Sequence, residues 1–293
     1  MKAWILAAAA ALSLTTAAQA AGPLPPAAIY TDPPADKAHP ARMEVLHIPS
    51  GGVQINGVAY VAAGAGAHPT VVLVHGLPGN EKNLDLAQAI RRAGWTVVTF
   101  NYRGSWGSPG NFSFKGNLED AKAVLAYVRT PDVAAKLQVD PAHLVIIGHS
   151  MGGWVTAVTA GQDAGLTGAA LISAADMTSL APAPLAARLR TATENMEALA
   201  GVTAQSMAEE MATLTPAMGF AAAAPGLAKK PLLVLTSDDG LAPGADALVA
   251  QIRKGGGTQV TTLHVATDHG WNSARIRLES EVLRWLATLP KAP

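Results

Sequence analysis

The stretch LVIIGHSMGGWVTAV, residues 144–158, decides how this chain folds. A short apolar run leads into Gly148, Ser150 and Gly152, and the residues after them have the composition of a helix. This order predicts a buried strand that turns sharply into a helix with the serine at the turn. In such a turn the hydroxyl projects above the sheet, and the positions two residues before and after the serine lie so close to neighbouring backbone that only glycine fits.

Further short apolar runs alternate with helix-like segments on both sides of this stretch. Continuous apolar strands are typical of a sheet buried on both faces, and the predicted ones are Thr70–His75, Trp95–Phe100, His143–Gly148, Gly168–Ser173, Pro231–Thr236 and Val260–Val265. Met43–Ile48 and Val53–Val61 instead alternate apolar with polar or small residues, as an antiparallel hairpin does. The predicted helices are Leu84–Ala93, Leu118–Arg129, Met151–Ala160, Ala245–Lys254 and Ser273–Leu289.

This alternation predicts an α/β fold in which a mainly parallel, eight-stranded sheet carries helices on both faces and the ligand site lies at the carboxyl ends of the strands. The interval of about 174–230 interrupts this alternation of strands and helices, since it is rich in Ala, Leu and Met and contains no convincing strand. We expect it to form a small helical cap over the strand ends. Ordinary crossover helices with a loose loop are the alternative.

The N-terminal region is typical of an exported protein. Residues 1–20 place Lys2 before an apolar run that ends in Ala18-Gln19-Ala20, the pattern of a cleavable signal peptide. We therefore expect a periplasmic or secreted protein without stable membrane insertion after processing, although an N-terminal anchor is the alternative. The proline-rich residues 21–40 predict an extended tether, and the folded domain, with the cap insertion, is expected to cover residues 41–290.

Composition narrows the class of partner. The chain has 21 Lys and Arg against 21 Asp and Glu and no basic run, so the charge pattern of a nucleic-acid-binding protein is missing and a small-molecule substrate is expected. No helix carries a His-x-x-x-His pair and no carboxylates cluster with ligand spacing, so we expect neither a metal nor a cofactor. The count of Cys is 0, and the fold must therefore rely on packing alone.

A serine hydroxyl becomes a useful nucleophile only beside a base, and the base needs a third group that fixes its tautomer. Two later segments offer such groups directly after predicted strands. Asp238 and Asp239 follow the strand Pro231–Thr236, and His269 follows the strand Val260–Val265. Because the carboxyl ends of parallel strands meet at one edge of the sheet, we expect these side chains to lie near Ser150.

With these residues the sequence resembles the α/β-hydrolase fold serine hydrolases, over nearly everything from about Met43 to Leu289. The resemblance implies that Ser150 is the nucleophile, His269 the base and Asp239 the acid. In that family the acid commonly stands four residues before a proline, here Pro243, which favours Asp239 over Asp238. His264 is the less favoured base because it lies inside the predicted strand.

The resemblance extends to two loops. The segment His75-Gly76-Leu77-Pro78-Gly79 matches the family's oxyanion loop, which implies that the backbone N–H groups of Leu77 and Met151 stabilise the oxyanion. The segment 101–114 is similar to the corresponding loop of prolyl oligopeptidase-type peptidases and esterase-like relatives. Residues expected to bind substrate are His75, Gly76, Trp106 and Phe112, although His75 could instead shape its loop and the glycine-rich segment could pack on itself.

Three functions are compatible with this reading. The first is an exported carboxylic ester hydrolase that works through an acyl-enzyme. The second is a single-domain serine peptidase or amidase related to prolyl oligopeptidases. The third is a binding protein that kept the fold and lost the chemistry, which the presence of all the catalytic residue types disfavours.

Overall fold

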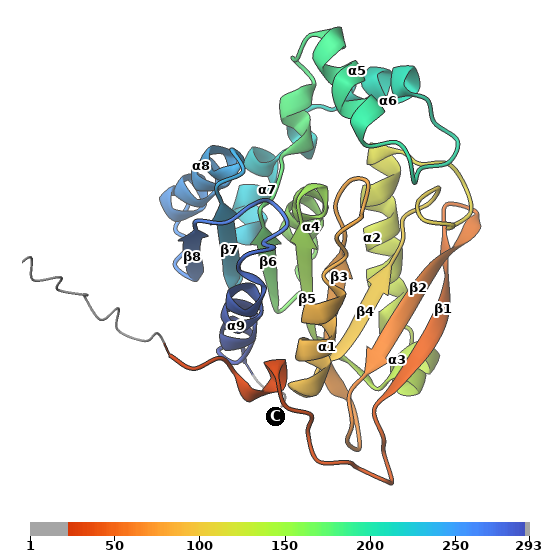
Figure 1. The fold of residues 1–293 in the computed structure, drawn as a ribbon, viewed down its shortest axis with the longest axis vertical. Coiled ribbons are helices and arrows are strands. Elements are labelled where there is room, and N and C mark those ends of the chain that lie inside the picture. Colours follow the sequence, from red (N-terminus) through yellow and green to blue (C-terminus); the bar gives the residue numbers. More distant parts are fainter. Residues whose placement is uncertain (1–22, 291–293) are drawn as a thin grey trace, which may run out of the picture.

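The computed structural model describes residues 23–290, and the sheet in this part of the chain has the strand order β1-β2-β4-β3-β5-β6-β7-β8 (Figure 1). The strands are β1 (Arg42–Ser50), β2 (Val53–Val61), β3 (His68–Val74), β4 (Thr96–Phe100), β5 (Val139–His149), β6 (Gly168–Ile172), β7 (Leu232–Ser237) and β8 (Val260–Val265). The β1–β2 and β2–β4 pairs are antiparallel, and the pairs from β4 to β8 are parallel. The predicted fold class is confirmed.

Helices cover both faces of the sheet (Figure 1). The α-helices are α1 (Leu84–Arg92), α2 (Phe114–Arg129), α3 (Pro131–Leu137), α4 (Met151–Gln162), α5 (Leu185–Glu194), α6 (Ala204–Ala212), α7 (Phe220–Leu227), α8 (Ala242–Lys254) and α9 (Arg275–Leu286), and the 3₁₀ turns are η1 (Ala27–Ile29), η2 (Met177–Leu180) and η3 (Pro216–Met218). Side chains alternate along each strand, so Val71 and Leu73 of β3 pack with α1 and α9, whereas Val72 and Val74 pack with α2, α4, α7 and α8.

The opening hairpin forms as its alternating pattern predicts. Residues of β1 are alternately exposed and buried towards its end, and β1 pairs with β2 from Arg42 opposite Val61 to Ser50 opposite Val53. Gly51 and Gly52 join the strands with φ of 56° and 83°. A two-residue turn with positive φ at both positions matches the twist of the hairpin and strongly favours glycine.

Three details differ from the sequence-based expectations. The strand β8 is not buried on both faces, because it forms the edge of the sheet and leaves Thr261, Thr262 and His264 exposed. The helix α3 has no counterpart among the predicted helices, since its seven residues are too few to show a helical period. Residues 23–40, predicted as part of an extended tether, are not extended throughout: they contain η1, and Arg92 Nη2 donates to the carbonyl oxygen of Ile29 at 2.9 Å.

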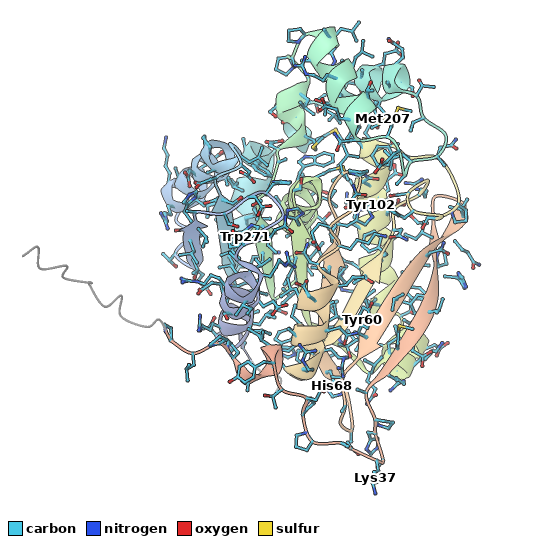
Figure 2. The ribbon with its side chains drawn as sticks, viewed as in Figure 1. Lys37, Tyr60, His68, Tyr102, Met207 and Trp271 are labelled. Carbon is cyan, nitrogen blue, oxygen red and sulfur yellow. The ribbon has the colours of Figure 1, made fainter. Side chains whose placement is uncertain are left out.

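The interval 174–230 is helical, as expected, but its parts pack in two ways. The helices α5 and α6 pack on each other and lie beyond the ends of the strands, at the top of Figure 1. The helix α7 returns to the body of the molecule and packs on α4. Met207 and Met211 of α6 are fully buried, and Met207 lies on the side that faces the sheet (Figure 2). These methionines therefore fill the interior between α6 and the body of the fold.

The predicted signal peptide lies in residues 1–20, outside the described residues. Within residues 23–290, the helices are all too short or too polar to serve as a membrane span.

Candidate active site

Ser150 stands between β5 and α4 in a strained backbone conformation, with φ of 59° and ψ of −125°. A Cβ atom on Gly148 would lie 2.0 Å from the carbonyl oxygen of Gly152, and one on Gly152 would lie 2.4 Å from the carbonyl oxygen of Val74. The glycines are therefore required by close backbone contacts, as the sequence pattern predicts. A non-glycine residue keeps a positive φ only when its surroundings enforce it, and such residues cluster at functional sites.

The acid and base follow the carboxyl ends of β7 and β8. His269 Nδ1 donates to Asp239 Oδ2 at 2.7 Å, and the N–H of Leu241 donates to Asp239 Oδ1 at 2.9 Å. Burial opposes the ionisation of Asp239, but the hydrogen bonds from His269 and Leu241 together hold its pKa below the usual value. A charged Asp239 that accepts from Nδ1–H leaves Nε2 of His269 free to accept a proton.

The neighbouring aspartate and histidine form a separate pair. His264 Nε2 donates to Asp238 Oδ1 at 2.9 Å, and Thr236 Oγ1 lies 2.9 Å from His264 Nδ1. Both side chains of this pair are at least half exposed, with 50% for His264 and 62% for Asp238. The structure thus brings Asp239 to His269 and Asp238 to His264.

His149, the residue before Ser150, is in contact with His269. Its Nε2–H donates to the carbonyl oxygen of His269 at 2.8 Å, and the two rings lie 4.7 Å apart. This contact places the loop that carries His269 directly over the residue before Ser150. In the described structure Ser150 makes no hydrogen bond to His269, and such bonds are often long or absent until substrate is bound.

The predicted oxyanion loop packs against the serine. A Cβ atom on Gly76 would lie 2.9 Å from Ser150 Cβ and 3.4 Å from Ser150 Oγ. Within residues 23–290, neither the N–H of Leu77 nor that of Met151 donates to another protein group. Met151 is the first residue of α4, where the N–H groups of a helix have no partner within it. Two unpaired donors beside a nucleophile are the requirement for an oxyanion hole.

The four residues expected to bind substrate occupy different environments. Gly76 touches Ser150, and Trp106 is 39% exposed and borders a surface cavity together with residues 197–200. Phe112 is 3% exposed and packs edge-on against Phe114, so its ring is part of the core and not of a substrate wall. His75 is buried, and its Nδ1–H donates to the carbonyl oxygen of Gly76 at 2.8 Å, which makes it a loop-shaping residue.

A buried polar chain beneath the site was not foreseen from sequence. Trp271, labelled in Figure 2, donates from Nε1 to Ser173 Oγ at 3.0 Å, and Ser173 Oγ lies 2.7 Å from Ser237 Oγ. Ser173 and Trp271 have positive φ, of 44° and 60°. The chain links the ends of β6 and β7 to the loop after His269. Serine and tryptophan at these positions carry no sequence signal that distinguishes them from ordinary core residues.

In the described part of the chain, no three His, Asp or Glu side chains gather as a potential metal site.

Comparison with known families agrees with this geometry. A model described as the alpha/beta hydrolase family matches residues 71–279, which is more than half of the chain. The chain belongs to the alpha/beta hydrolase family.

Two curated relatives of this α/β hydrolase match over part of their length. An uncharacterized protein of Mycobacterium tuberculosis is 31% identical over 150 residues, which cover 51% of this chain and 50% of that protein. The lysophosphatidylserine lipase ABHD12 of Danio rerio is 32% identical over 89 residues, which cover 29% of this chain and 22% of that protein. The chain therefore spans half or less of the length of these relatives.

Solved structures share the fold over most of this α/β hydrolase. The thermostable carboxylesterase EstE1 from a metagenomic library superposes with a TM-score of 0.62 at 23% identity, covering 85% of this chain and 89% of that chain. The acylaminoacyl peptidase of Pyrococcus horikoshii superposes with a TM-score of 0.61 at 14% identity, covering 86% of this chain and 42% of that chain. Identities this low establish a common fold.

We expect this α/β hydrolase to lose stability in mild acid because of two buried histidines. Burial lowers the pKa of His75 from 6.5 to about 4 and that of His149 from 6.5 to about 4. Between these values the unfolded chain binds protons that the folded chain excludes, so the free energy of unfolding falls as pH drops from 6.5 towards 4. Each histidine is expected to contribute about 2 kcal/mol to this loss.

Urea unfolding at pH 7 and pH 4.5 measures the effect, and the variant His149→Gln should remove close to half of the histidine contribution. Equal stability of the wild-type protein at the two pH values would show that the imidazoles are not held neutral by burial.

Proposed function

We propose that this chain is an exported hydrolase that cleaves carboxylic esters through a Ser-His-Asp acyl-enzyme mechanism. The observation that carries the proposal is the placement of Ser150 in a strained strand-to-helix turn, against the loop that offers the free N–H of Leu77. The Asp239–His269 hydrogen bond supplies an oriented base at the same edge of the sheet. Fold likeness to a carboxylesterase is consistent with this assignment.

In the proposed first half-reaction, Ser150 Oγ attacks the ester carbonyl while its proton passes to His269 Nε2. Asp239 keeps the imidazole in the required tautomer and stabilises the imidazolium. The N–H groups of Leu77 and Met151 donate to the oxyanion of the tetrahedral intermediate. When this intermediate collapses, the alcohol leaves with the proton from His269 and the acyl group remains on Ser150.

In the second half-reaction, His269 takes a proton from water, and the resulting hydroxide attacks the acyl carbonyl under the same two N–H groups. Collapse returns the proton to Ser150 and releases the carboxylic acid. The His269 side chain is 42% exposed, so it has room to rotate towards Ser150 when substrate excludes water.

A comparison of two substrate classes tests this function. We expect short p-nitrophenyl esters to be hydrolysed at least about a hundredfold faster, in kcat/KM, than aminoacyl and prolyl anilides, because the amide leaving group is poorer and needs protonation as it departs. The purified chain without residues 1–20 is the enzyme for this assay. Strong anilide cleavage with negligible ester cleavage would instead establish the peptidase alternative.

Export is the part of the proposal that rests on residues 1–20 alone. Mass spectrometry of the protein recovered from its native host should find a mature chain that begins at Ala21. A chain that retains Met1 and remains with the cytoplasmic fraction would contradict export.

A further inference from the structure

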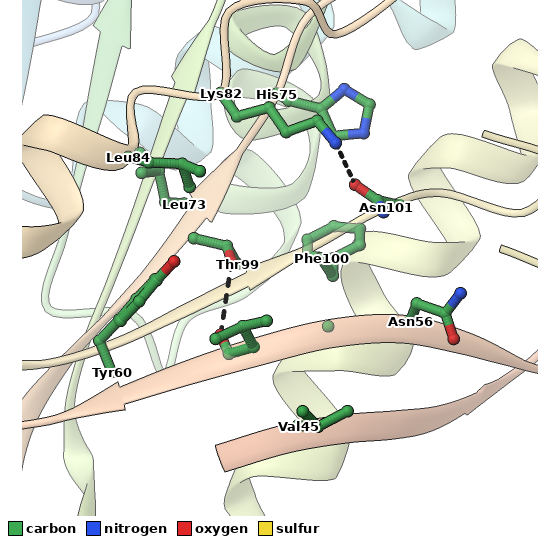
Figure 3. A pocket seen from close by; sticks show the side chains of 12 residues that line it. Val45, Asn56, Tyr60, Leu73, His75, Lys82, Leu84, Thr99, Phe100 and Asn101 are labelled. Carbon is green, nitrogen blue, oxygen red and sulfur yellow. Dashed lines mark hydrogen bonds between the residues drawn. The ribbon is translucent and has the colours of Figure 1, made fainter. Parts of the chain in front are cut away.

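A cavity of about 260 Å³ lies beside the oxyanion loop, on the face of the sheet that carries α1 (Figure 3). Val58 of β2 and Leu73 of β3 form apolar parts of its wall, and Leu84 at the start of α1 closes one side. Lys82, His75 and Asn101 gather at one end, as Figure 3 shows. An apolar wall with a few polar groups at one end is typical of a small-molecule site.

Lys82 is a half-buried cation that has no acidic partner among the residues that the structure describes. Its Nζ donates to Asn101 Oδ1 at 2.9 Å and lies 4.5 Å from the centre of the Trp106 ring. Among the ion pairs of residues 23–290 none includes Lys82, and burial lowers the pKa of its ammonium group. A partly desolvated charge is costly unless it is paired, so this end of the cavity favours an anion.

The other polar groups at this end do not neutralise the ammonium. The carbonyl oxygen of Gly76 can only accept, so Nδ1 of His75 carries the ring hydrogen. His75 is buried and its Nε2 has no hydrogen-bond partner among the described residues. Of the residues that line the cavity in the described structure, Lys82 alone has a formal charge at neutral pH.

We propose that this cavity binds a small carboxylate with a short apolar chain. The carboxylate accepts a charge-assisted hydrogen bond from Lys82 Nζ, and the chain packs on Val58, Leu73 and Leu84. Ser150 does not line this cavity, but His75 and Lys82, which do, belong to the segment 75–82 that contains the oxyanion loop. Trp106, whose ring lies beside Lys82, donates from Nε1 to the carbonyl oxygen of Pro78 in this segment at 2.7 Å.

A ¹⁹F NMR titration of the chain with 6,6,6-trifluorohexanoate tests the proposal without requiring turnover. We expect saturable binding to the wild-type protein and an affinity that is about tenfold weaker or worse in Lys82→Met, which keeps the apolar stem and removes the charge. The same substitution at Lys254, an exposed lysine on α8, should leave the affinity unchanged. The neutral probe 6,6,6-trifluorohexan-1-ol should bind about tenfold more weakly than the carboxylate.

A second variant keeps Lys82 and fills the cavity. Val45 lines the cavity and is 63% exposed on β1, so Val45→Trp should block the probe without disturbing the core. Unchanged affinity in Lys82→Met or in Val45→Trp would overturn the proposal. If Ser150 reacts with a fluorophosphonate and the labelled protein no longer binds the probe, the carboxylate occupies the active site instead. Because the Lys82 and Val45 variants need no reactive serine, their outcome is independent of the proposed function.

Discussion

Replacing Ser150 by alanine is expected to lower kcat/KM for a short p-nitrophenyl ester by roughly 10⁵-fold. The alanine variant keeps the oxyanion donors of Leu77 and Met151 but has no hydroxyl to form the acyl-enzyme. Residual turnover must then proceed by direct attack of water, which the oxyanion hole alone accelerates only in part. Steady-state kinetics with the ester concentration varied well above KM measures the loss.

The folded state is the necessary control for this variant. The positive φ of 59° at position 150 is equally unfavourable in energy for serine and for alanine. The midpoint of thermal unfolding of Ser150→Ala should therefore lie close to that of the wild-type protein. Labelling by a fluorophosphonate should disappear in the variant and be present in the wild-type protein. A folded Ser150→Ala protein that retains a hundredth or more of the wild-type rate would contradict the assignment of the nucleophile.

The variant Asp239→Asn is expected to lower kcat for the ester by roughly 10⁴-fold. The asparagine amide can donate a hydrogen bond to Nδ1 of His269. That hydrogen bond favours the tautomer in which the ring hydrogen is on Nε2. In that tautomer the ring nitrogen that must accept the proton of Ser150 is already occupied. The negative charge that stabilises the imidazolium is also lost, so the effect should appear mainly in kcat.

The adjacent aspartate provides a matched control for this prediction. Asp238 is 62% exposed and bonds to His264, which is itself half exposed. The change Asp238→Asn should therefore leave kcat within about threefold of the wild-type value, because exposed ion pairs contribute little. A large loss of kcat in Asp238→Asn together with a small loss of kcat in Asp239→Asn would show that Asp238, and not Asp239, is the catalytic acid.

Local patterns in the sequence were sufficient to predict the sheet. The β-strands could be recognised because burial on both faces selects short apolar runs, and Gly148 and Gly152 marked the turn because a side chain there meets backbone. The same reasoning failed at β8, where an apolar pattern does not reveal that a strand lies at the sheet edge. It also failed for Phe112, because the sequence of a glycine-rich loop does not show whether its aromatic side chain packs in the core or contacts a substrate.

The sequence by itself determined the order of strands and helices, the position of Ser150 at a turn, and the presence of acids and histidines after two later strands. Only the tertiary structure decided which aspartate contacts which histidine, that His149 contacts His269, and that Lys82 lies at one end of a cavity with no acidic partner in residues 23–290. The reason is that periodicity and spacing report the burial of each residue along its own strand or helix. Contacts between loops depend on strand register and backbone direction, which are set by the packing of the whole sheet.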